Sequence, residues 1–293
     1  MDSHAILQAL LLSLALAMLY AAVAAGLTLE FGVTRIVNFA HGDFVMLGAF
    51  ITYFLYTRYA VSPGVGIFVA GLAMGVLSAI VYYAFLARVL RQDEHNQLLA
   101  TLGLSIVMVN VAAILWSPDP RAMHVPDILP TLAWQGVIIP GNSVFVAVIG
   151  LLMYVALVLF MRHTRFGIQM RLARDDRDLA LYSGVNVNLM FAMSFVIGGL
   201  TAGIAGGLVA LVLYVHPMVG SDLVIRAFAI VALGGLGSIP GALVGAVVLS
   251  VTETMISTFV PRGASWGYGI AFLIIVLVLL IKPTGLYGTK EHA

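Results

Sequence analysis

The sequence predicts an all-α polytopic membrane protein, a bundle of about eight to nine transmembrane helices that includes short or broken ones. Of its 293 residues, 62% are hydrophobic and only 9% are charged, and the mean hydropathy is +1.08. A soluble domain carries about 25% charged residues and cannot bury this much apolar surface. No polar stretch is long enough for a separate soluble fold, so residues 1–293 are expected to form a single transmembrane domain.

Five apolar segments are each long enough to cross a hydrocarbon core of about 30 Å, which requires about 20 helical residues. In chain order they are Ala5–Leu29, Pro63–Leu86, Leu98–Trp116, Asn142–Met161 and Leu189–Val215. Gly267–Ile281 is a further apolar segment near the carboxyl end. Five prolines between positions 118 and 140 predict a rigid, irregular loop outside the membrane.

Three apolar segments are shorter. Phe44–Tyr56 can cross only if its helix starts upstream and carries His41 and Asp43 into the membrane. The two others, Leu223–Leu233 and Ala242–Met255, are separated by a glycine-rich turn. Because these segments are short, we expect short or broken helices in these three regions. Interrupted hydrophobic segments of this kind point to a permeation path.

A charged loop, residues 162–188, lies between two of the long apolar segments and holds five of the fourteen basic residues. Loops rich in Lys and Arg stay in the cytoplasm, so this loop is expected there. With the amino terminus outside and nine crossings, the carboxyl terminus is cytoplasmic too. If a short segment is re-entrant, the number of crossings changes and the side of this loop does not.

Within this loop, Met170–Leu181 is predicted to form a short amphipathic helix, with apolar residues on one side and charged residues on the other. Gly184 follows as a candidate for the residue that ends the helix. The cluster of arginines could serve only to orient the chain beside anionic lipid headgroups. Alternatively, the helix could dock on a soluble partner, and we slightly favour docking.

Polar residues gather between the first two apolar segments. Glu30 and Arg35 could form a local ion pair that closes a tight inside loop. Asn38, His41 and Asp43 could line a translocation path, because ionisable residues at membrane depth usually face a cavity or a partner. The structural and the functional interpretation are equally supported by the sequence.

Two features further along the chain carry the same ambiguity. Glu253 lies deep in an apolar segment and needs a partner such as Arg226 or a wet cavity, so it is a fourth candidate for the path. Small residues recur through Gly198–Gly207 at a spacing that forms one helix face. Such a face more often serves close helix packing than substrate contact.

Several chemistries are disfavoured. The chain has no cysteine, and no pair of histidines has the HExxH spacing of a zinc helix. The turn at 234–241 lacks the lysine of a nucleotide-binding P-loop, since Ala242 follows its last glycine. We therefore expect no cofactor, no metal, no nucleic-acid partner and no catalysis by this chain. If transport is powered by ATP, the ATPase must be another polypeptide.

Three blocks of the sequence resemble the LivH-type permease subunit of the branched-chain amino acid ABC transporter family. They are Gly32–Gly48, Arg171–Asn186 and Gly234–Gly241, in the expected order along nearly the whole chain. The resemblance implies a permease subunit in the bacterial inner membrane. Its implied partners are a second, LivM-like permease or a second copy, two cytoplasmic ATPase subunits and a periplasmic binding protein.

The resemblance also implies that the middle block is the coupling helix that docks on an ATPase. The residues carried over to that role are Arg171, Asp175, Asp176, Ala180 and Gly184. The same architecture could instead import urea, short amides or other amino acids. A less favoured alternative is an ion-coupled secondary transporter. An intramembrane hydrolase would need two facing aspartates, and Asp43 and Asp222 are expected at opposite ends of their helices.

Overall fold

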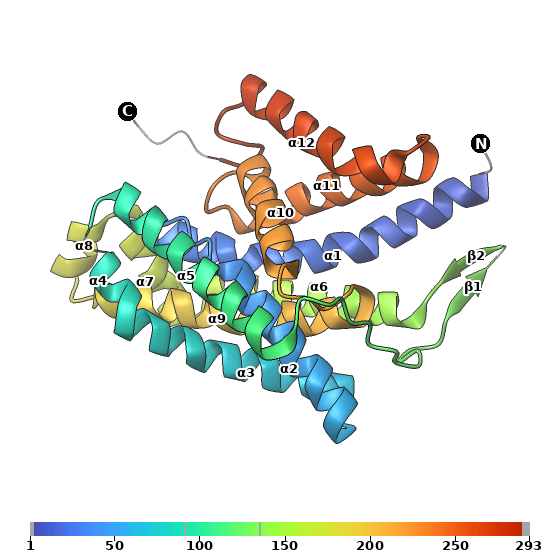
Figure 1. Ribbon diagram of the computed structural model, residues 1–293. Helices are drawn as coiled ribbons and strands as arrows, with labels where there is room; N and C mark the ends of the chain where they lie inside the picture. Colours follow the sequence, from blue (N-terminus) through green and yellow to red (C-terminus); the bar gives the residue numbers. More distant parts are fainter. Residues whose placement is uncertain (1–2, 91, 135, 289–293) are drawn as a thin grey trace.

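The structure is a computed structural model that describes residues 3–90, 92–134 and 136–288. Long helices lie side by side in a bundle, with the α7–α8 segment and the β1–β2 hairpin at its opposite ends (Figure 1). The first half contains α1 Ser3–Thr34, α2 His41–Tyr59, α3 Pro63–Val81, a π-helical turn Tyr82–Leu86, α4 Ala87–Val89 and α5 Glu94–Trp116. The second contains β1 Leu132–Trp134, β2 Val137–Ile139, α6 Gly141–His163, α7 Arg165–Asp175, α8 Arg177–Tyr182, α9 Val187–Val212, α10 Val219–Gly234, α11 Ile239–Phe259 and α12 Gly263–Ile281.

Among the residues that the structure describes, six helices are long and apolar enough to cross a membrane: α1, α3 with its continuation to Val89, α5, α6, α9 and α11. This confirms a polytopic helical membrane protein. The expected eight to nine crossings require further helices, and α2, α10 and α12 are the candidates. Among these, α10 has only 16 residues and carries Asp222 and Arg226.

The shorter apolar segments are helical, as expected, and each helix is longer than the predicted apolar segment. Helix α2 starts upstream of Phe44–Tyr56, at His41, and so includes both His41 and Asp43. The segment predicted as Ala242–Met255 belongs to α11, whose 21 residues can span a bilayer, so its classification as a short helix was wrong. Ser238 explains the extension, because its hydroxyl accepts the Gly241 N–H at 3.2 Å and starts the helix earlier.

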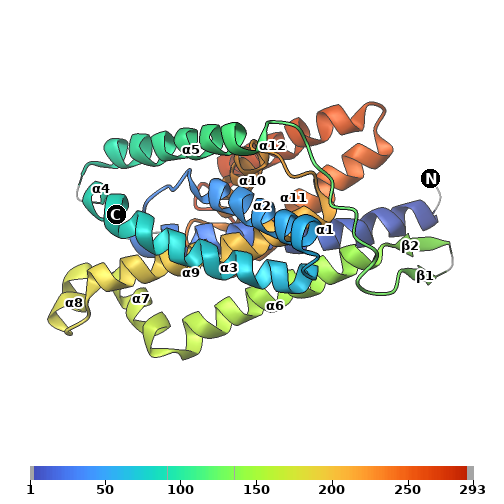
Figure 2. The same cartoon turned by 60° about the horizontal axis from the view of Figure 1, so that its bottom comes forward.

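Helix α9 forms the centre of the bundle, and α5 lies at its edge (Figure 2). In the most apolar stretch of α9, 72% of the residues are buried, whereas in that of α5 only 11% are buried. The predicted small-residue face of α9 packs closely against its neighbours. A Cβ atom on Gly203 would lie 2.4 Å from the Ala70 carbonyl of α3, and one on Gly206 would lie 2.0 Å from the Val45 carbonyl of α2. The packing interpretation of this face is confirmed.

The proline-rich loop lies at the end of the bundle that carries the β1–β2 hairpin (Figure 1). The hairpin was not predicted, and its strands pair antiparallel with Leu132 opposite Ile139. Arg121 joins the loop to the segment after α9 through two backbone hydrogen bonds with Val215, of 3.0 and 2.8 Å. Hydrogen bonds from the Thr131 hydroxyl and then from the Asn142 N–H lower the pKa of Asp127 in this loop.

Candidate functional site

The charged loop folds as two short helices, α7 and α8, instead of the single helix predicted at Met170–Leu181. The interruption lies at Asp176, whose backbone is extended. Its Oδ1 atom accepts the Leu179 N–H at 2.9 Å and caps α8. Aspartate is a poor residue for a helix interior and a good one for a helix start, which explains the interruption.

The end of α8 agrees with the prediction. Gly184 has a φ of +75°, the left-handed conformation that glycine adopts without strain. The Val185 N–H then reaches back to the Ala180 carbonyl at 2.9 Å, as in a Schellman motif. Asn186 caps the next helix by accepting the Leu189 N–H at 3.1 Å. Helix α8 is therefore joined to the central helix α9 by a short and fully hydrogen-bonded connection.

The outer side of α8 is apolar as well as charged. Leu179, Leu181 and Tyr182 are 51%, 59% and 89% exposed. These three residues, named here the α8 patch, follow one another closely in the sequence, yet the sequence analysis did not identify them as a surface. Exposed apolar groups on a polar loop mark contact sites for other proteins.

The five residues to which the family resemblance assigns a coupling role differ in their exposure. Asp175, Asp176 and Gly184 are exposed, and Arg171 is half-buried. Ala180 is fully buried and supports the helix from inside.

A buried polar cluster lies where the chain turns from α1 into α2. His41 Nδ1 lies 3.1 Å from Glu30 Oε1, and Asn38 Nδ2 donates to Glu30 Oε2 at 2.8 Å. All three side chains are at most 2% exposed. The expectation that Glu30 pairs with Arg35 was wrong, because both oxygens of the carboxylate serve these nearer partners. We name this group the Glu30 cluster.

The second ring nitrogen of His41 lies 3.1 Å from the Val23 carbonyl of α1. A carbonyl only accepts, so this nitrogen carries a hydrogen. The other nitrogen faces the Glu30 carboxylate, and a hydrogen bond there requires one proton between the two groups. The cluster thereby satisfies its own polar atoms, as burial away from water demands.

Glycines make room for the Glu30 cluster. A Cβ atom on Gly198 of α9 would lie 2.0 Å from Glu30 Oε1. One on Gly26 of α1 would lie 2.8 Å from His41 Cε1. The cluster therefore fixes the positions of α1, α2 and α9 relative to one another.

A second polar cluster joins α1, α10 and α11. Arg226 Nη2 lies 3.0 Å from Glu253 Oε1, which confirms Arg226 as the expected partner of Glu253. The Tyr20 hydroxyl donates to Glu253 Oε2 at 3.0 Å. The Arg226 guanidinium also lies 5.8 Å from the centre of the Tyr20 ring. Glu253 is thus held in a structural network.

Asp43 differs from the other three path candidates. It is 1% exposed, and neither carboxylate oxygen has a hydrogen-bond partner among the described residues. The Ser105 hydroxyl of α5 faces it, outside hydrogen-bonding geometry. Asp222 lies in the first turn of α10, as Asp43 does in α2, so their expected placement at opposite helix ends was wrong. Asp222 is exposed, so the two carboxylates do not form a buried pair.

In the part of the chain that the structure describes, no three His, Asp or Glu side chains gather as a metal site would require. The sequence and structure nevertheless have clear relatives. Residues 9–279 match the family described as the permease component of the branched-chain amino acid transport system.

The chain is 31% identical to the high-affinity branched-chain amino acid transport system permease protein BraD of Pseudomonas aeruginosa, over 97% of this chain and 96% of that protein. It is 27% identical to the corresponding permease protein LivH of Escherichia coli, over 93% and 92%. The structure of PsaBC from Streptococcus pneumoniae in complex with Fab has a similar fold, with a TM-score of 0.50 and 16% identity over 98% of this chain and 95% of that one.

Removing the carboxylate of Glu30 and removing that of Asp43 should have different effects on stability. Glu30→Ala leaves His41 and Asn38 without their partner and should cost roughly 3 to 5 kcal/mol of unfolding free energy. Asp43→Asn replaces a buried carboxyl group that has no hydrogen-bond partner among the described residues with an amide of the same size, and should leave stability unchanged or raised. Thermal unfolding of the purified protein in detergent measures both. Equal losses for the two variants would contradict the distinction.

Proposed function

Because the chain belongs to the family of permease components of the branched-chain amino acid transport system, we propose that it is the membrane subunit of an ATP-driven importer of branched-chain amino acids. The observation that carries this proposal is the family match over nearly the whole chain. The relatives are named for branched-chain amino acids, which favours these substrates over urea or short amides. Substrate passes from a periplasmic binding protein to the cytoplasm by alternating access.

The two ends of the bundle are proposed to face opposite sides of the membrane and to contact different partners. We place the hairpin end outside, facing the binding protein, and the α7–α8 end in the bacterial cytoplasm (Figure 1). The arginines of α7 and α8 support this orientation. The complete chain acts as one permease domain with eight or nine crossings in the inner membrane, and its carboxyl terminus is cytoplasmic. Two ATPase subunits and a second permease, LivM-like or a second copy, complete the importer.

Helix α8 is the proposed coupling helix. Its exposed apolar side chains, the α8 patch, would enter a cleft of the ATPase, with Asp175 and Asp176 at the rim. The half-buried Arg171 belongs to the same segment, the buried Ala180 supports it from inside, and Gly184 permits its sharp exit into α9. The Arg177 guanidinium lies 4.7 Å from the centre of the Phe191 ring of α9, which adds a second link between the two helices. A displacement of α8 on ATP binding would therefore move α9.

Fewer residues remain candidates for the translocation path than the sequence suggested. The polar side-chain atoms of Asn38, His41 and Glu253 form hydrogen bonds within the protein. Asp43 has no hydrogen-bond partner in the part of the chain that the structure describes, and it lies beside α5, the least buried of the candidate spans. We assign Asp43 to the path, where its charge would attract the ammonium group of an amino acid when α5 moves away.

Docking is tested by ATPase binding to the purified permease complex in detergent. Tyr182→Ala removes the most exposed residue of the α8 patch and should weaken binding about tenfold, since buried aromatic anchors dominate interfaces. Tyr59→Ala is the matched control, because Tyr59 is 72% exposed at the far end of α2 and should have no effect. Normal ATPase binding by Tyr182→Ala and by Gly184→Val would remove the coupling assignment.

The role of Asp43 is tested by uptake in proteoliposomes that contain the complete importer. Asp43→Asn keeps the size of the side chain and removes its charge, and it should lower leucine uptake at least about tenfold. ATPase binding by the same variant should be normal, which separates a defect of the path from one of docking. Wild-type uptake by Asp43→Asn would exclude Asp43 from the path.

A further inference from the structure

Two adjoining cavities lie between α7 and the ends of α1 and α5. Their volumes are about 370 and 1180 Å³, and Val33, Arg35, Glu94 and Arg174 line both. The larger one exceeds the roughly 300 to 1,000 Å³ of a typical small-molecule pocket. Arg171 and Asp175, which belong to the proposed coupling segment, line the larger cavity, and no ligand is assigned to this space above.

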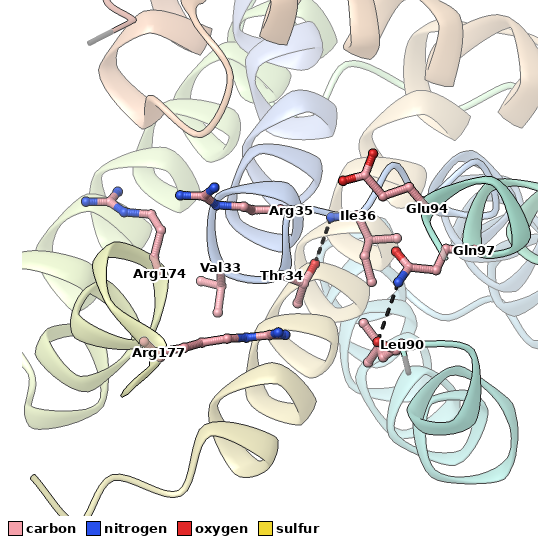
Figure 3. Close-up of a pocket in the computed structure, with 10 residues that line it drawn as sticks. Val33, Thr34, Arg35, Ile36, Leu90, Glu94, Gln97, Arg174 and Arg177 are labelled. Carbon is pink, nitrogen blue, oxygen red and sulfur yellow. Dashed lines mark hydrogen bonds between the residues drawn. The ribbon is translucent and has the colours of Figure 1, made fainter. Parts of the chain in front are cut away.

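The two cavities are strongly basic. Among the residues that the structure describes, five guanidinium groups and two carboxylates line them, a formal excess of three positive charges over this set. The arginines are Arg35, Arg162, Arg171, Arg174 and Arg177, and the acidic residues are Glu94 and Asp175. Figure 3 shows Arg35 extending toward Arg174, with Arg177 crossing the cavity below them and Glu94 on the far side.

Charge clustering of this kind favours an anion. Arginine cannot lose its charge in a protein, so the cluster cannot relieve its repulsion by releasing protons. Asp175 is already bonded to Arg174, with Nε and Oδ1 at 2.7 Å. Guanidinium groups bind phosphate with paired hydrogen bonds, which makes a phosphate group the matching ligand.

The larger cavity has an apolar wall beside its basic rim. Phe31 belongs to α1, Val158 and Met161 to α6, Leu236 to the turn after α10, and Leu279 to α12. Since α1 and α6 are candidate spans that end beside these arginines, the proposed orientation places the cavity where the hydrocarbon layer meets the headgroups. A soluble anion needs the arginines alone, whereas a phospholipid would use both surfaces.

We propose that this cavity binds an anionic phospholipid of the cytoplasmic leaflet. Its phosphate lies among Arg35, Arg174 and their neighbours, and its acyl chains cover the apolar wall. This inference rests on the proposed orientation, which places α7 in the cytoplasm. Basic pockets between transmembrane helices on that side are suited to anionic headgroups. The lipid would join the end of α1 to α7 and so stabilise the segment that carries the α8 patch.

The test is native mass spectrometry of the full-length chain, titrated in detergent with phosphatidylglycerol or phosphatidylcholine. Wild type should retain phosphatidylglycerol in preference to phosphatidylcholine. Arg35→Gln with Arg174→Gln should weaken phosphatidylglycerol binding about thirtyfold, as expected for two arginines near a membrane surface. Arg88→Gln is the control, because Arg88 is an exposed arginine of α4 that lines neither cavity.

Four results would overturn the proposal. Equal retention of both lipids, or wild-type binding by the double variant with an unchanged unfolding temperature, would exclude a specific anionic lipid site. Displacement of the lipid by millimolar inorganic phosphate would assign the arginines to a soluble anion. Loss of the lipid on addition of the ATPase subunits would assign them to acidic side chains of that partner. Because no transport is measured, each of these outcomes leaves the importer proposal standing.

Discussion

The fold depends on satisfying polar groups where the chain reverses inside the bundle. Hydrocarbon offers no hydrogen bonds, so a chain that leaves one helix and starts another within the membrane must supply its own partners. The Glu30 cluster does this between α1 and α2, with Asn38 and His41 from the connection and first turn of α2. Gly198 of α9 allows the cluster to exist, since any side chain there would overlap Glu30.

The central helix α9 links this core to the surface. Its small residues contact α2 and α3 at backbone distance, and its first turn follows directly from α8. Helices packed this closely cannot slide independently, because the contacts involve backbone atoms and not flexible side chains. In the proposed mechanism, this rigidity carries a displacement of α8 toward the buried start of α2, where Asp43 lies.

The long apolar segments and the end of α8 at Gly184 could be predicted because hydropathy and the glycine signal act locally along the chain. The partner of Glu30 could not, since Arg35 is closer in sequence and only the turn of the chain brings His41 to the carboxylate. The division of the charged loop followed from Asp176, whose capping preference outweighs a continuous amphipathic pattern. His41 and Asp43 are equally buried and differ in their hydrogen-bond partners among the described residues, which the sequence does not display.

In the proposed function, this chain is a permease without its own energy source. Leucine uptake by proteoliposomes tests this directly, when vesicles that contain the chain alone are compared with vesicles that also contain a second permease, the ATPase subunits and the binding protein. We expect no uptake by the chain alone under a proton or sodium gradient, and ATP-dependent uptake by the complete assembly. Gradient-driven uptake by the chain alone would contradict it.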